Sequence, residues 1–206
     1  MTPDNEIIRA SRDTPGRFGE LFDRYAVPLH RYAHRRAGAA AADDIVSETF
    51  LHAFDGRHRY DLDREHALPW LFGIATNVLR RYHRTEARLM RQEARDQAPD
   101  TGAEAFLRAE ERQDAAIRTR RLLSELRQLR RGDRDTILLA AWGGLGTADI
   151  AEALGIPPGT VKSRLHRVRA RLARAEASVI TLHETTNDPG TEAEHVRLVD
   201  PAPAAS

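Results

Sequence analysis

The stretch TADIAEALGIPPGTVKSRLHRVRARL, residues 147–172, indicates the fold more clearly than any other part of the chain. Ile150, Ala151 and Leu154 recur at helical spacing. Gly155 tolerates a positive φ and stands where that helix should end. The Pro-Pro pair that follows cannot continue a helix, and its second member suits the first position of a new one. The stretch therefore predicts a helix, a tight turn and a second helix.

The predicted second helix has one apolar and one basic side. Its apolar positions step by four, three and four residues, through Val161, Leu165, Val168 and Leu172. The other side carries no acid, and its candidates for DNA contact are Thr160, Lys162, Ser163, Arg164, His166 and Arg167. A helix fits the DNA major groove, where Arg and Lys pair with phosphates or guanine edges. The pattern predicts a helix-turn-helix that reads duplex DNA; the alternative is a helical hairpin with a solvated basic face.

Composition limits the remaining possibilities. The chain has 206 residues, 41% hydrophobic and 31% charged, which suffices for one or two small domains. Aromatic residues make up 6%, and the alternating Val/Ile/Thr pattern of strands is absent, so we expect an all-α protein. The net charge is +1, so the basic character is local. Cysteine is absent, which excludes disulfides and thiolate chemistry. No signal peptide or membrane-spanning window is evident, so we expect a cytoplasmic protein without membrane insertion.

The pattern divides the chain into two small helical domains joined by a flexible linker, and the C-terminal domain is the helix-turn-helix. In the first domain, a helix beginning near Phe18 should be kinked or divided at Pro28 and should end at Gly38. A connection over 39–42 then leads to the next helix. The expected segments are a loose leader at 1–16, a helical domain at 17–90, a linker at 91–119, the second domain at 120–176 and a mostly disordered tail at 177–206.

Acidic residues begin the segment DDIVSETFLHAF, residues 43–54. Asp43, Asp44 and Glu48 lie at the expected helix start and on its outer face. Acids near a helix N-terminus are favourable by themselves, so capping with a solvated face explains them. An acidic docking surface for a basic partner explains them equally well. The residues alone leave both interpretations open.

A second basic surface is expected on the helix PWLFGIATNVLRRYHRTEARL, residues 69–89. Its polar side carries Asn77, Arg80, Arg81 and Arg84. Trp70 and Tyr82 stand at the edge of that side, where aromatic rings can stack on unpaired bases. Core packing is the alternative role for these two aromatic residues.

Enzymatic motifs are missing from the sequence. There is no Gly-rich phosphate loop, no GxSxG and no HExxH, so we predict no catalytic residue and no cofactor. His30 and His34 have the spacing of a shared helix face, but no third ligand is evident, and solvated or packed histidines are the favoured interpretation over a metal site. A helical enzyme that uses the histidines and carboxylates of residues 30–66 is a rival hypothesis without a supporting motif.

Three segments in the same order resemble the extracytoplasmic-function (ECF) group of bacterial RNA polymerase sigma factors. DDIVSETFLHAF is similar to the group's DD-x-x-QETF signature, and PWLFGIATNVLRRYHR is similar to its WL-x-x-IA-x-N segment. The helix-turn-helix resembles its EIA-x-x-LG-x-x-x-GTVKSRL-x-RAR signature. The resemblance covers about residues 18–172 and implies the two domains usually called regions two and four.

The resemblance implies a promoter-specificity subunit with defined partners. Asp43, Asp44 and Glu48 would face the β′ clamp helices of core RNA polymerase, and the β flap would be a further contact. Trp70, Asn77, Arg80, Arg81 and Arg84 would lie at the melted minus-ten element. The residues that would read the minus-thirty-five element as duplex are Thr160, Lys162, Ser163, Arg164, His166 and Arg167. An anti-sigma factor is a further candidate partner. A stand-alone helix-turn-helix regulator is the rival, and the separate acidic and basic helices of the first domain argue against it.

Overall fold

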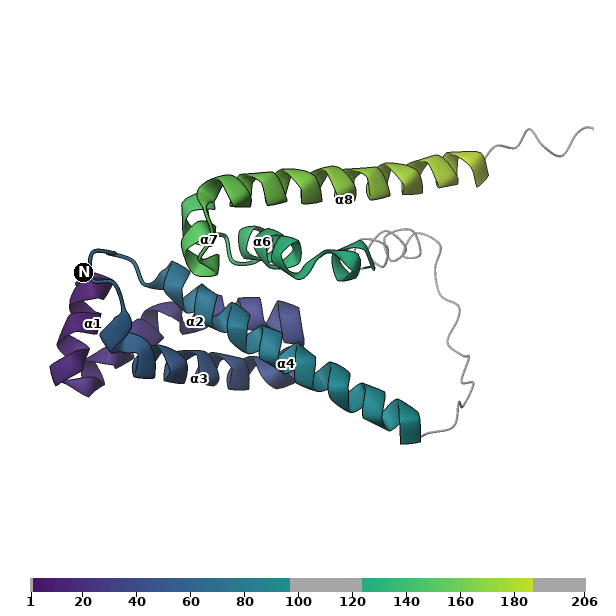
Figure 1. Ribbon diagram of the computed structural model, residues 1–206. Helices are drawn as coiled ribbons and strands as arrows, with labels where there is room; N and C mark the ends of the chain where they lie inside the picture. The colour runs from purple at the N-terminus through teal and green to yellow at the C-terminus, as the bar shows by residue number, and fades with distance from the viewer. Residues whose placement is uncertain (1, 97–123, 187–206) are drawn as a thin grey trace, which may run out of the picture.

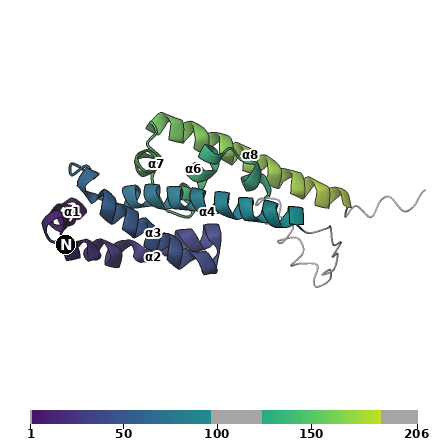
Figure 2. The ribbon, with the colours of Figure 1, turned by 60° about the horizontal axis from the view of Figure 1, so that its bottom comes forward.

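The computed structural model describes residues 2–96 and 124–186, and along these residues every regular element is helical, as predicted (Figures 1 and 2). The N-terminal domain contains α1 (Asp4–Asp13), η1 (Pro15–Phe18), α2 (Gly19–Ala37), α3 (Ala39–Gly56), η2 (Arg57–Arg59) and α4 (Leu68–Asp96). The C-terminal domain contains α6 (Arg131–Ala141), α7 (Thr147–Leu154) and α8 (Pro158–Thr186). The predicted linker from residue 97 onward and the tail beyond residue 186 lie outside the described residues. Helix α8 extends past Ala177, where the tail was expected to begin.

The N-terminal segment is not the loose leader that its polar composition predicted. It forms α1, whose Ile7 and Ile8 are fully buried. The Asp4 carboxylate fixes the start of this helix. It accepts hydrogen bonds from Arg24 Nη1 at 2.6 Å, Tyr25 OH at 2.5 Å and the Ala67 backbone N–H at 2.8 Å. Two adjacent isoleucines and one buried, fully paired acid therefore suffice to attach α1 to the domain.

Helices α2 and α3 also depart from the expected boundaries. Pro28 lies inside α2, and the helix continues through it to Ala37 instead of dividing. Gly38 ends α2 as predicted, with a φ of 83° that side-chain-bearing residues rarely adopt. Helix α3 then starts at Ala39, so the expected connection over residues 39–42 is part of the helix. The alanine run has high helix propensity, which accounts for the early start.

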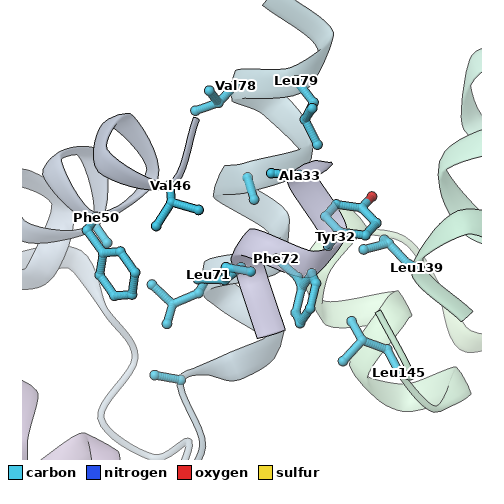
Figure 3. Close-up of a cluster of buried hydrophobic side chains, with 14 of the residues drawn as sticks. Tyr32, Ala33, Val46, Phe50, Leu71, Phe72, Val78, Leu79, Leu139 and Leu145 are labelled. Atoms are coloured by element: carbon cyan, nitrogen blue, oxygen red, sulfur yellow. The ribbon is translucent and has the colours of Figure 1, made fainter. Parts of the chain in front are cut away.

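One continuous core joins the two domains, an arrangement that the sequence did not predict. Phe72 of α4 is fully buried and meets the Tyr32 ring edge-on, with centroids 5.1 Å apart. Leu139 and Leu145 of the C-terminal domain belong to the same buried cluster, and Figure 3 shows them beside these two aromatic rings. Both ribbon views accordingly place α6, α7 and α8 as a layer along α4 (Figures 1 and 2).

The predicted helix-turn-helix is formed by α7 and α8. Gly155 follows α7 with a φ of 62°, and its N–H donates to the Glu152 carbonyl at 3.1 Å. Pro158 is the first residue of α8. On the apolar side of α8, Val161, Leu165 and Val168 are buried as expected. Among the described helices, none is both long enough and apolar enough to cross a membrane.

Candidate nucleic-acid and polymerase interfaces

Helix α8 presents most of its predicted DNA-contacting side chains to solvent. Lys162, Ser163, His166 and Arg167 are exposed, whereas Thr160 and Arg164 are half-buried. Lys162 has no hydrogen-bond or ion-pair partner among the side chains that the structure describes. This face of α8 is therefore open to an anionic ligand, with Lys162 as its unpaired cation.

Acids and carbonyls of neighbouring elements partly engage the arginines of α8. Arg164 is 24% exposed, and its Nη1 donates to the Gly132 carbonyl at 3.4 Å. Arg167 is 64% exposed, and its Nη2 donates to Asp133 Oδ1 at 3.3 Å. The sequence pattern placed both residues on one DNA-reading face, because it could not show what α6 brings against α8. The structure holds Arg164 against α6, while Arg167 remains largely accessible.

Helix α4 carries the second predicted basic surface. Asn77, Arg81 and Arg84 are exposed along one side of the helix. Arg80 is only 29% exposed, and its Nη1 donates to Asn77 Oδ1 at 3.0 Å. Trp70 is half-buried, and its ring lies 4.8 Å from that of the buried Tyr60. In this structure Trp70 therefore packs against Tyr60, as the core-packing alternative expects. The exposed polar side of α4 begins at Asn77.

Arg80 also pairs with a residue of the other domain. Its Nε lies 2.8 Å from Oδ2 of Asp135 in α6, and Arg36 Nη2 of α2 lies 3.1 Å from the other carboxylate oxygen. Asp135 is 1% exposed. Burial lowers the pKa of Arg36, but attraction to Tyr32 and Asp135 and hydrogen bonds to both outweigh it, so the pKa is raised and the side chain stays charged. Both arginines are therefore cations bound to one buried carboxylate.

The acidic residues of α3 lie where capping does not explain them. Because α3 begins at Ala39, its first turn contains no acid, and Asp43, Asp44 and Glu48 follow it. Asp44 is exposed without a side-chain partner among the described residues. The other two are partly engaged: His30 Nε2 lies 3.2 Å from Asp43, and Arg81 Nη1 donates to Glu48 at 2.7 Å. The helix start thus removes the capping interpretation that the sequence had left open.

A groove with apolar residues lies beside these acids. It measures about 330 Å³ and is lined by Phe22, Ala26, Val27, His30, Arg31, Asp43 and Val46. Phe22 is 45% exposed and Val27 is 57% exposed. The sequence does not single out either residue as part of a binding surface. Phe22 has the helical spacing of the apolar residues Phe18, Leu21, Tyr25 and Leu29, which predicts a core position, whereas Val27 lies off that spacing and was the available signal.

The histidine pair of α2 lacks the geometry of a metal centre. The His30 and His34 rings have centroids 6.2 Å apart, and His30 faces Asp43. No cluster of three or more His, Asp or Glu side chains suited to a metal ion occurs in the described part of the chain.

Two family matches coincide with the two domains. Residues 21–89 match the family described as Sigma-70 region 2, and residues 119–172 match Sigma-70, region 4. The first match includes the acids of α3 and the basic side of α4, and the second includes the helix-turn-helix. The matched order is that of the resemblance noted in the sequence.

Two relatives that match over most of their length are named RNA polymerase sigma factors. The ECF RNA polymerase sigma factor SigL of Mycobacterium tuberculosis strain ATCC 25618 / H37Rv is 36% identical over 162 residues, which cover 77% of this chain and 89% of the relative. The RNA polymerase sigma factor CnrH of Cupriavidus metallidurans is 32% identical over 184 residues, covering 84% of this chain and 95% of the relative.

Solved structures agree with the fold. CnrH in complex with the cytosolic domain of CnrY has a TM-score of 0.59 at 27% identity, covering 85% of this chain and 97% of that chain. The sigma factor RpoE in complex with the anti-sigma factor NepR from Bartonella quintana has a TM-score of 0.53 at 23% identity, covering 78% and 96%, and supports the fold alone. With both domains, their order and the full-length relatives in agreement, the chain belongs to the ECF sigma factors, which direct bacterial RNA polymerase to promoters in transcription initiation.

Proposed function

We propose that this sigma factor uses three surfaces in transcription initiation, each for a different binding partner. The acids of α3 and the adjoining α2–α3 groove dock on the β′ clamp helices of core RNA polymerase, while the C-terminal domain contacts the β flap. The basic side of α4 binds the minus-ten element as it melts. The exposed face of α8 reads the minus-thirty-five element as duplex. The protein performs no covalent chemistry in this scheme, and it acts in the cytoplasm, where its polymerase works.

The docking surface combines charge with exposed apolar area. Asp44 is accessible and unpaired among the described residues, and Phe22 and Val27 are exposed in the groove that the neighbouring Asp43 lines. Exposed apolar side chains next to charged residues are typical of protein-interaction sites. A basic amphipathic helix fits both features, because its cations pair with the acids while its apolar residues enter the groove.

The minus-ten surface is carried by the exposed polar side chains of α4. Asn77, Arg81 and Arg84 can contact phosphates and base edges of a separated strand. Extrusion of a base costs a few kcal/mol, which such contacts must offset. In our proposal, Trp70 supports the start of α4 through its packing on Tyr60, and Arg80 joins the surface only when it is released from Asp135.

The exposed polar face of α8 is the observation that most strongly supports the proposal. Within a helix-turn-helix, α8 exposes Lys162, Ser163, His166 and Arg167 on one side while it buries Val161, Leu165 and Val168 on the other. This orientation presents hydrogen-bond donors to base edges and phosphates in the major groove. Thr160 and Arg164 lie at the margin of that face, and Arg164 supports α6 in addition.

An inhibitory protein partner is part of the proposal. CnrH has been solved in complex with the cytosolic domain of CnrY, and RpoE in complex with the anti-sigma factor NepR. For this chain, the same accessible α2–α3 groove is available to an anti-sigma factor when polymerase is absent. Such a partner would compete with core polymerase for Asp44 and the groove.

In vitro transcription of pooled genomic fragments tests the proposal. Core RNA polymerase is incubated with fragmented DNA of the source organism, with and without the protein, and the new transcripts are sequenced. We expect protein-dependent start sites that share two upstream elements. A stand-alone helix-turn-helix regulator would bind one duplex element and would give no protein-dependent transcripts with core polymerase alone, which would contradict the proposal.

A further inference from the structure

A second groove, here called the α8 groove, lies along helix α8 and reaches the first residue of α7. It measures about 490 Å³ and is lined by Thr147, Lys162, Leu165, His166, Arg169, Ala170 and Ala173. Three of these residues are apolar, three are basic, and no acid is among them. The groove shares Lys162 and His166 with the face proposed to read DNA, and it continues along α8 beyond that face to Ala173.

The basic residues of α8 differ in whether the C-terminal domain neutralises them. Three arginines lie within 4 Å of a carboxylate oxygen of Asp133 or Glu125: Arg164, Arg167 and Arg171. The three basic residues of the α8 groove are all exposed, and they have no ion pair or hydrogen bond among the described side chains: Lys162, His166 and Arg169. Positive charge that the domain does not balance therefore borders the groove.

The composition of the α8 groove indicates what kind of ligand fills it. Phosphates of DNA can pair with its basic residues, but they leave the apolar side chains Leu165, Ala170 and Ala173 without a partner. A peptide that carries acids and apolar residues together satisfies both parts of the lining. The groove therefore fits an acidic, partly apolar polypeptide segment.

The chain carries such a segment shortly after α8. Residues 191–200 read TEAEHVRLVD, in which acids stand on both sides of three apolar residues, Val196, Leu198 and Val199. The whole stretch 187–206 contains four acids and one arginine, so its charge is opposite to that of the groove. Both features that the groove requires of a ligand occur together in residues 191–200.

The segment is long enough to reach the α8 groove from the end of its helix. Helix α8 is continuous to Thr186 (Figure 1). At 1.5 Å per residue, the axial distance from Thr186 back to Arg169 is about 25 Å, and that to Lys162 is about 36 Å. An extended chain from Thr186 to Asp200 spans up to about 46 Å at 3.3 Å per residue. Residues 191–200 can therefore run back along α8 over the whole length of the groove.

We propose that residues 191–200 dock in the α8 groove and compete with the minus-thirty-five duplex for Lys162 and His166. The inference rests on the proposed role of α8 as the reader of that element. The acids of the segment pair with the basic residues of the groove, while its valines and leucine pack on the apolar ones. Because the segment belongs to the same chain, its effective concentration at the groove is about millimolar, so a weak contact suffices.

Two-dimensional ¹H–¹⁵N NMR of the full chain without DNA tests the docking. The double variant Val196→Ser with Leu198→Ser removes apolar contacts and leaves the charge unchanged. We expect the amide signals of Thr147, Ala170 and Ala173 to shift relative to the parent. Ala202→Ser with Ala204→Ser, outside the docking segment, is the matched control and should leave these signals in place.

Two results of the NMR experiment would overturn the docking. One is that the amide signals of the groove stay unchanged in the Val196→Ser, Leu198→Ser variant. The other is that they move with protein concentration in the parent, because the segment would then occupy the groove of a second copy.

Binding to a duplex with the minus-thirty-five element, as identified by the transcription experiment, tests the competition. A docked population of about 90% would weaken the apparent affinity about tenfold, so the Val196→Ser, Leu198→Ser variant should bind about tenfold more tightly than the parent. Neutralisation of the segment by Glu192→Gln, Glu194→Gln and Asp200→Asn should give a gain of at least that size. The matched control removes three acids at exposed positions of the N-terminal domain and should give no such gain: Asp13→Asn, Asp23→Asn and Asp63→Asn.

The two kinds of variant distinguish docking from simple repulsion of DNA. A gain in duplex affinity for the neutralised segment alone, without a gain for the Val196→Ser, Leu198→Ser variant, would mean that the acids repel DNA without occupying the groove, and this would overturn the inference. Shifted amide signals without a gain in affinity for either variant would overturn the competition.

Lys162→Ala separates the inference from the proposed function. If this replacement weakens duplex binding while the variants of residues 191–200 bind like the parent, the inference fails and the role of α8 stands. If Lys162→Ala leaves duplex binding unchanged, the proposed role of α8 fails, and the NMR comparison still decides whether the segment docks.

Discussion

Arg80 and Asp135, 55 residues apart in sequence and in different domains, form a hydrogen-bonded ion pair with 2.8 Å between Nε and Oδ2. One member comes from the basic side of α4, and the other is a buried acid of α6. The pair shows that a residue expected at the promoter is hydrogen-bonded to the other domain in this arrangement. Under the proposed role of α4, Arg80 contacts the promoter only after its guanidinium group leaves Asp135.

Replacement of Lys162 by alanine tests the face of α8. Lys162 is exposed and lacks a partner among the described residues, so its loss should leave the fold unchanged. If it contacts a base edge, the free energy of binding to a duplex with the minus-thirty-five element should weaken by about 1–3 kcal/mol, while binding to unrelated duplexes should not change. If it contacts a phosphate, the loss should be equal on all sequences and the salt slope should fall by about one unit. Unchanged binding and an unchanged salt slope would mean that this face does not meet DNA.

Replacement of Arg164 by alanine should give a different result. Its Nη1 bonds to the Gly132 carbonyl, so we expect a loss of about 1.5 kcal/mol in the free energy of unfolding. Urea denaturation of this variant beside Lys162→Ala measures the difference. Equal stability of the two variants would show that Arg164 does not support α6.

Charge reversal at Asp44 tests polymerase docking. Asp44→Arg should lower co-purification with core RNA polymerase, because it places a cation where the partner is expected to be basic. The exposed site should keep stability within about 0.5 kcal/mol of the parent. Asp63→Arg, an equal charge change at another exposed position, is the control and should co-purify normally. Equal recovery of both variants would exclude Asp44 from the interface.

Truncation of a buried side chain tests the attachment of α1. Ile8 is fully buried, so Ile8→Ala should lower the free energy of unfolding by about 2–5 kcal/mol. Denaturant unfolding measures this loss, and Glu6→Ala, at an exposed position of the same helix, controls for helix propensity. A change below about 0.5 kcal/mol for Ile8→Ala would mean that the segment is the loose leader that its composition suggests.

His83 should make stability depend on pH. Burial lowers its pKa below the ordinary value of 6.5, the charges of Arg36 and Arg134 lower it further, and Glu86 opposes them. Between the folded and unfolded pKa values, the unfolded chain binds a proton that the folded chain does not, so stability falls as pH falls through and below 6.5. The loss of Tm between about pH 7.5 and 5.5 should therefore be smaller for His83→Gln than for the parent. An equal loss in both proteins would exclude His83 as the cause.

Local signals in the sequence were sufficient for the helix-turn-helix and insufficient for the packing around it. The structure confirms the turn at Gly155, the start of α8 at Pro158 and the burial of Val161. Each of these features depends on neighbouring residues, so the sequence could predict it. The burial of Ile8 and of Asp135 depends on partners far along the chain, which periodicity does not reveal. For the same reason, the sequence placed Arg164 and Arg80 on open basic faces, while the structure pairs both with α6.

We propose that α4 and α8, two surfaces of one chain, read two promoter elements at a fixed separation. Run-off transcription from an identified promoter, with the spacer between the elements lengthened by about 5 base pairs, half a helical turn, tests it most directly. We expect this insertion to nearly abolish the transcript, because α4 and α8 can no longer reach both elements in register. Undiminished transcription from the lengthened spacer would contradict the claim, since one element would then suffice.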